Sequence, residues 1–154
     1  TVQEYMSSFA WDMHEAASQT FLTGALLIVS AGRVQESAAD PADGTVLGIA
    51  NGPGNNGLAD AVKTQFTPFF PGTIIEANLC SGAAGSHVLA QTNMGVAYGM
   101  IKRTVSGLTH WVIDVDETDA GDVMGRVVGF RDDVGDTNAR VYFAVGEAKC
   151  VFGG

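Results

Sequence analysis

The segment from His110 to Val145 constrains the fold most, because it is patterned as three short strands separated by two acidic turns. Apolar residues alternate with other residues in its first and last parts, at Trp111, Ile113 and Val115 and again at Val141, Phe143 and Val145. A period of two places alternate side chains on opposite faces of a strand. The segments 116–122 and 132–138 are rich in Asp and Gly, which favour chain reversal. We therefore predict an antiparallel meander with these apolar residues in the core.

Short apolar runs of the same kind recur upstream of this segment. They predict further strands over 24–29, 34–36, 45–50, 63–70, 73–79 and 96–103, with a bulge at Gly48. Ser86 and Gly95 have the types of residue that begin and end helices, and they predict one short helix near 86–93. The fold class that follows is all-β: a small antiparallel β-barrel or sandwich.

Residues 1–19 differ from the rest, because they lack the alternation of strands and carry large apolar side chains. Met6, Phe9 and Met13 are spaced so that a helix would place them on one face. One hypothesis is that this segment packs on its own domain. The other is that it is an extended or short-helical arm that docks on a partner, because so much apolar surface needs cover. The candidate docking residues are Tyr5, Met6, Phe9, Trp11 and Met13. At 154 residues, we expect this arm and one β-barrel-like domain over 20–154.

An aromatic cluster, Phe66, Phe69 and Phe70, lies beside Pro68 and Pro71. Proline cannot donate a hydrogen bond to a neighbouring strand, so this segment is expected at an edge or corner of a sheet. Phenylalanines of this kind most often belong to a core. An interface between subunits is the second interpretation, because aromatic side chains at an edge suit contact between copies.

The charge balance limits the partners that the chain can have. Seventeen Asp and Glu oppose eight scattered Lys and Arg, for a formal net charge of −9, which argues against direct nucleic-acid binding. The start of the sequence has no signal-peptide pattern, and its longest apolar run, Ala25 to Val29, is too short to span a bilayer. We therefore expect cytoplasmic synthesis and no membrane partner. Cys80 and Cys150 lack metal-type spacing and are expected to be buried free thiols.

No residue set with a recognisable catalytic pattern emerges. Five acids fall between Asp114 and Asp122 without the spacing of a calcium loop, so a solvated turn is expected there. His14, His87 and His110 form no metal-ligand motif. We therefore expect no catalytic residue, metal or cofactor. A hydrolase that uses a pair of carboxylates is the least favoured alternative.

The order of the β segments carries more information than any one of them. These segments are Gly24-Ala25-Leu26-Leu27, Ala31-Gly32-Arg33-Val34, Thr45 to Ala50, Phe66-Thr67-Pro68, Pro71 to Leu79, Gly95 to Gly99, Trp111 to Asp114, Arg126 to Phe130 and Arg140 to Phe143. In this order, over about residues 20–152, the chain resembles the capsid decoration, or cement, proteins of tailed double-stranded DNA bacteriophages.

The resemblance implies a structural virion protein without catalytic residues or cofactor. Such a protein binds the outside of the phage head and clamps neighbouring major capsid subunits against the pressure of packed DNA. It also implies self-association, with a homotrimer favoured and a dimer as the alternative, and a terminal arm on the capsid, here residues 1–19. The alternative function is that of a virion β-barrel that adheres to host-surface glycans.

Overall fold

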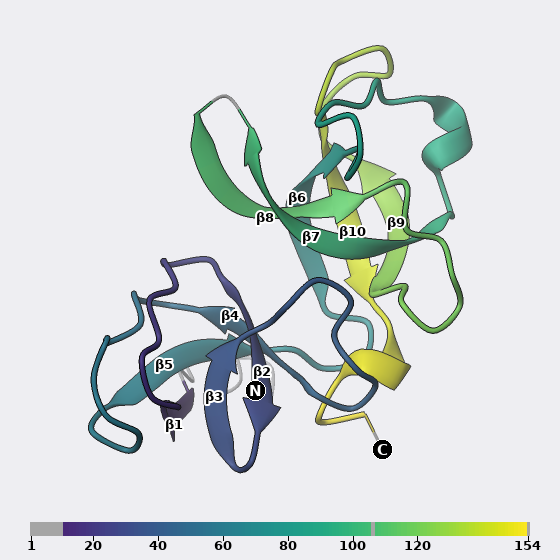
Figure 1. The fold of residues 1–154 in the computed structure, drawn as a ribbon. Coiled ribbons are helices and arrows are strands. Elements are labelled where there is room, and N and C mark those ends of the chain that lie inside the picture. Colours follow the sequence, from purple (N-terminus) through teal and green to yellow (C-terminus); the bar gives the residue numbers. More distant parts are fainter. Residues whose placement is uncertain (1–10, 106, 154) are drawn as a thin grey trace, which may run out of the picture. The chain divides into compact units, whose positions relative to one another are not determined.

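The computed structural model describes residues 11–105 and 107–153, and these form ten strands and two short 3-10 turns. The predicted all-β class is confirmed. The chain separates into two compact units, which differs from the single domain expected over 20–154 (Figure 1). Unit 1 holds the described residues up to Ser37 together with Val46–Phe69, and unit 2 holds Ala38–Thr45 together with the chain from Phe70 onward.

Unit 1 is one antiparallel sheet with the strand order β1-β5-β4-β2-β3. Its strands are β1 (Trp11–His14), β2 (Leu26–Ser30), β3 (Arg33–Glu36), β4 (Val46–Ala50) and β5 (Lys63–Pro68). The sheet curls so far that its two edges meet, through a parallel bridge between Glu15 and Val34. Its fully buried side chains include Phe21, Leu26, Leu27, Val34, Val46, Leu47, Phe66 and Phe69. The predicted bulge is present beside Gly48, because the β2–β4 register shifts there. A side chain at Gly48 would collide with the backbone of Thr67.

The segment expected as an arm contributes a strand to unit 1. β1 pairs with β5 from Trp11 opposite Phe66 to His14 opposite Lys63. The chain is extended here because β5 offers an open edge, whose backbone groups are satisfied by a neighbouring strand. Met6 and Phe9, on which the helical spacing depends, lie outside the described residues, as does Tyr5.

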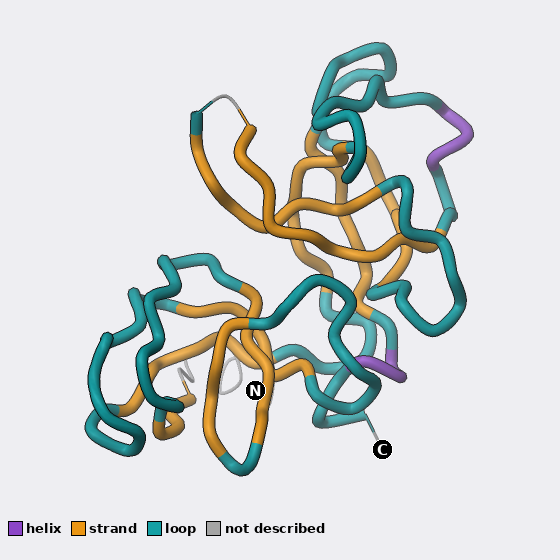
Figure 2. Tube along the Cα trace, in the orientation of Figure 1, coloured by secondary structure: helices purple, strands orange, loops and turns teal. Residues whose placement is uncertain are grey.

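Unit 2 is a closed barrel with the strand order β10-β6-β8-β7-β9 (Figure 2). Its strands are β6 (Ile74–Cys80), β7 (Ala97–Val105), β8 (Leu108–Asp114), β9 (Gly125–Phe130) and β10 (Arg140–Val145). The 3-10 turns are η1 (Gln91–Asn93) and η2 (Glu147–Lys149). β6 and β8 run parallel, and the other neighbours are antiparallel. In a closed barrel, a strand has no exposed edge wherever it is hydrogen-bonded to a neighbour on both sides.

The predicted meander is correct in its strands and in the antiparallel pairing of β9 with β10, but wrong in placing β8 next to β9. β8 pairs with β7 and β6, and β7 lies between β8 and β9. The reason is that β7 ends at Val105 and β8 begins at Leu108, so the two strands are adjacent in sequence, and they pair over seven residues. The burial of Trp111, Ile113, Val141, Phe143 and Val145 confirms the predicted core, whereas Val115 is half-buried.

The helix expected near 86–93 is reduced to the single 3-10 turn η1. At the predicted start of this helix, the backbone of residues 87–89 instead forms hydrogen bonds with the loop before β10. Val88 bridges Thr137, and the Leu89 amide donates to the Asp136 carbonyl. Backbone groups that are bonded to a neighbouring segment cannot also form a helical ladder.

Candidate functional site

The aromatic residues predicted for an interface lie mainly in the core. Phe66 and Phe69 are fully buried in unit 1, as the first interpretation expected. Phe70 is half-buried in unit 2, and its ring centroid lies 5.4 Å from that of Phe152. Of the two described arm residues, Trp11 is 39% exposed and Met13 is half-buried. Among the described aromatic residues of these two predicted sets, Trp11 is therefore the most exposed.

Two acids of the 114–122 segment are structural. Asp114 is buried at the end of β8 and accepts hydrogen bonds from the Gly82 amide (2.7 Å) and the Asp116 amide (3.0 Å). Asp116 accepts hydrogen bonds from the Ser81 hydroxyl and the Ala83 amide. A Cβ atom at Gly82 would lie 2.1 Å from an Asp114 carboxylate oxygen, so only glycine allows this approach. The two carboxylates fasten the loop after β6, which corrects the expectation of a wholly solvated turn.

This arrangement makes stability depend on pH. The bond from the Ala83 amide, and then that from the Ser81 hydroxyl, lower the pKa of Asp116. A carboxyl group with a lowered folded-state pKa contributes stability above its unfolded pKa of about 4, and this stability is lost as pH falls through the folded value. We expect Asp116→Asn to lower the urea midpoint at pH 7, and we expect its difference from the wild type to shrink at about pH 3.

The matched control for this prediction is Asp133→Asn, in an exposed turn of the same unit. This variant should follow the wild type at both pH values. An Asp116→Asn deficit that is equally large at both values would show that the lost stability does not come from the ionised carboxylate.

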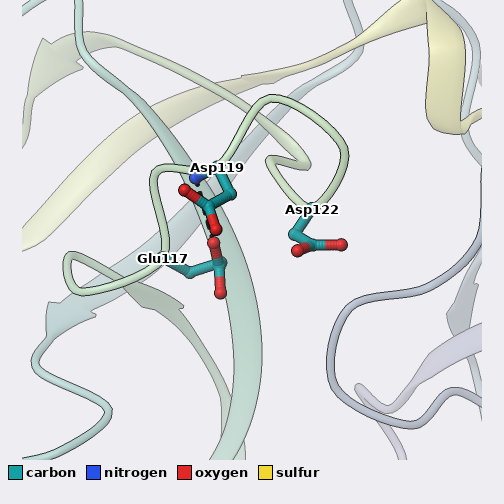
Figure 3. A group of neighbouring side chains, drawn as sticks. All are labelled: Glu117, Asp119 and Asp122. Carbon is teal, nitrogen blue, oxygen red and sulfur yellow. Dashed lines mark hydrogen bonds between the residues drawn. The ribbon is translucent and has the colours of Figure 1, made fainter.

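The other three acids of this segment converge. Carboxylate oxygens of Glu117, Asp119 and Asp122 lie within 4.8 Å of one another (Figure 3). The Asp119 amide donates to Glu117 at 3.0 Å, which fixes one side of the group. Carboxylates so placed have the donor chemistry that hard cations prefer. The group is partly solvent-exposed, and clusters of this kind also occur on acidic turns that bind nothing.

A buried lysine lies against the same loop. Lys149, at the end of η2, is 2% exposed. Its ammonium group donates to the Pro41 carbonyl at 2.8 Å and to the Gly121 carbonyl, and it pairs with a carboxylate oxygen of Asp43 at 3.0 Å. Lysine has three N–H donors, and these three oxygens match them. The Lys149 side chain thus ties two distant loops together inside unit 2.

A second buried polar network lies around η1. The Asn93 side chain accepts from the Ala90 amide at 2.8 Å and donates to the Tyr98 hydroxyl at 2.9 Å. His87 Nε2 lies 3.2 Å from Asn93 Oδ1. The partners of Asn93 are thus protein groups, and buried amides paired in this way stabilise a loop. The network joins two segments that flank η1.

A shallow cleft of about 280 Å³ opens on unit 1. Buried Glu15 lies in its wall, where its carboxylate accepts from the Asn55 amide at 2.9 Å and from the Thr64 hydroxyl. The remaining lining residues are Asn51, Gly52, Pro53, Val62, Lys63 and Gln65. Amide and hydroxyl groups of this kind can hydrogen-bond a polar ligand. Asn51, Gly52, Pro53 and Asn55, which come from one loop, form one wall.

The two cysteines are free and buried, as predicted. Burial raises the pKa of both thiols, which keeps them in the less reactive protonated form. His14 lies in β1, His87 in the loop before η1 and His110 in β8. The three histidines therefore belong to three separate elements. Within the described residues, no helix is long and apolar enough to cross a membrane. No protein-family model, curated protein or solved structure matches this chain.

The groups that sequence reasoning missed are Lys149, Asn93 and Glu15. Each is a polar residue whose partners are 3 to 108 residues away along the chain. Sequence gives no signal for such partners, since lysine, asparagine and glutamate are ordinarily surface residues.

Proposed function

We propose that this protein decorates the outside of a bacteriophage head and cements neighbouring major capsid subunits. The observation that carries the proposal is the order of β segments between residues 20 and 152, which resembles that of capsid decoration proteins. The nine strands from β2 to β10 occupy the segments on which this resemblance rests. An all-β chain of this size is compatible with the role.

Exposed apolar side chains on both units are consistent with a protein that binds a lattice. Leu22 and Leu58 on unit 1 are 60% and 82% exposed, and Ile74 and Leu108 on unit 2 are 61% and 71% exposed. A lattice presents the same small contact many times, so weak contacts add through high effective concentration. Scattered apolar groups can therefore suffice where a single stable heterodimer would need a larger continuous interface.

The structure changes how the arm hypothesis should be tested. Removing residues 1–19 would also remove β1 and buried Glu15, and so damage unit 1. Removing residues 1–10 leaves both in place. We expect this shorter truncation to remain folded and to lose most binding to heads of the encoding phage that were assembled without the protein.

The full-length chain should occupy repeated positions on such heads, as seen by cryo-electron microscopy. A Trp11→Ala variant tests whether the exposed Trp11 side chain in β1 also contributes to binding the head. Heads that remain bare at saturating full-length protein would overturn the decoration proposal. Full occupancy by the 1–10 truncation would reject only the arm.

A further inference from the structure

The β7–β8 pair leaves the barrel as a two-stranded ribbon (Figure 1). Only Ala97 and Tyr98 of β7 pair with β9, and only Ile113 and Asp114 of β8 pair with β6. The outer five register pairs, from Ile101 opposite Val112 to Val105 opposite Leu108, are made by the two strands with each other. We call the outer residues 101–105 and 107–112 the ribbon.

The ribbon lies in a part of the chain with an unusual charge. No Asp or Glu occurs from Ala77 to Ile113, and the Lys and Arg of that segment are Lys102 and Arg103, both in the ribbon. The rest of the chain holds the other six Lys and Arg and all seventeen acids, for a formal charge of −11. The ribbon is therefore a positively charged segment of an otherwise strongly acidic chain.

The ribbon also has features of a surface that needs cover. Two-stranded ribbons are marginally stable in water, and their outer edges carry backbone groups that can pair with another chain. Near its end, Leu108 is 71% exposed. Lys102 is exposed, whereas Arg103 is half-buried with its guanidinium 3.5 Å from the Ala83 carbonyl. A hydrogen bond between the Thr104 and Thr109 hydroxyls (2.7 Å) holds the two strands together.

We propose that the ribbon docks on the acidic surface of a second copy of this chain, with Lys102 supplying charge and Leu108 supplying apolar contact. Opposite potentials orient two molecules before contact and favour the complementary pairing. A second copy offers that complementarity, because its charge outside the acid-free segment is −11. The proposal does not rest on capsid binding, because contact between copies is measured on the isolated protein.

The test is sedimentation equilibrium of the full chain across a range of salt concentrations. We expect reversible self-association that weakens as salt rises, because the screening length falls from about 10 Å at 0.1 M to about 3 Å at 1 M. Lys102→Glu and Leu108→Ser should each raise the dissociation constant roughly tenfold or more. Lys102→Arg should retain association, because it keeps the charge.

Unit 1 supplies matched controls of the same residue types. Lys63 is an exposed lysine in a surface ion pair with Asp12, and Leu58 is 82% exposed. Lys63→Glu changes the net charge as much as Lys102→Glu does, and Leu58→Ser removes a similar apolar side chain; both should leave association unchanged. A wild type that stays monomeric up to about 1 mM would overturn the proposal. Equal weakening by Lys63→Glu and Lys102→Glu would also overturn it, since general repulsion would then explain both effects.

Discussion

Phe143→Ala is expected to lower the free energy of unfolding of unit 2 by roughly 3–5 kcal/mol. The Phe143 side chain is fully buried in β10, between its register partners Ile75 on β6 and Val127 on β9. A Cβ atom at Gly125 would lie 2.7 Å from the Phe143 ring, so the ring occupies the space that this glycine leaves open. Truncation would leave a cavity where three strands meet, and the closed ladder limits how far they can move to fill it.

Each unit holds one of the chain's two tryptophans, which allows their unfolding to be followed separately. Trp11 lies in unit 1 and Trp111 in unit 2, so a Trp11→Phe background leaves Trp111 as the reporter of unit 2. The measurement is the urea midpoint and slope from Trp111 fluorescence. Tyr142→Ala, next to Phe143 but 39% exposed, should have a much smaller effect. Equal effects of the two substitutions would mean that β10 does not bury the face assigned to it.

Lys149→Met should destabilise unit 2 by roughly 2–5 kcal/mol, although it removes a charge from the interior. Methionine matches the apolar stem of lysine but cannot donate to the carbonyls of Pro41 and Gly121. Two carbonyls would lose their charged donor, and a buried polar group left without a partner costs about 1–3 kcal/mol. The urea midpoint reported by Trp111 measures the loss.

Asp43→Asn separates the ion pair from the carbonyl bonds in this prediction. The Asp43 side chain is 66% exposed, so water can replace much of its interaction with Lys149, and this variant should change stability by less than about 1 kcal/mol. Lys63→Met controls for the loss of an exposed lysine. A larger effect of Asp43→Asn than of Lys149→Met would show that the ion pair, and not the two carbonyls, holds the loops.

Local pattern was sufficient to predict the positions of most strands. Alternation located β8 and β10, and glycine marked the bulge beside Gly48, because both signals arise from neighbouring residues. The same signals predicted the pairing of β9 with β10 but not the pairings between segments distant in sequence. The placement of β7 between β8 and β9, and the parallel contact of β6 with β8, depend on closing a barrel from distant segments.

The buried polar residues could not be predicted from the sequence for a related reason. Lys149 and Glu15 are buried because backbone groups from distant loops converge on them, and neither residue differs locally from a surface residue. For the aromatic cluster, the sequence favoured a core over an interface, and Phe66 and Phe69 are indeed buried. β1 was missed because its apolar–polar alternation is only four residues long and its partner strand, β5, is distant in sequence.

The loop that Lys149 binds gives the chain an interleaved order. Residues 38–45 belong to unit 2, but they lie in sequence between two stretches of unit 1. On a translating ribosome, unit 1 is complete once Phe69 has emerged, whereas the lysine that anchors residues 38–45 follows 80 residues later. This loop must therefore remain without its charged anchor until Lys149 has been made. Cleaving the chain at one position cannot give two fragments that each hold one whole unit. The folding of the two units is therefore coupled by the order of their segments in the chain.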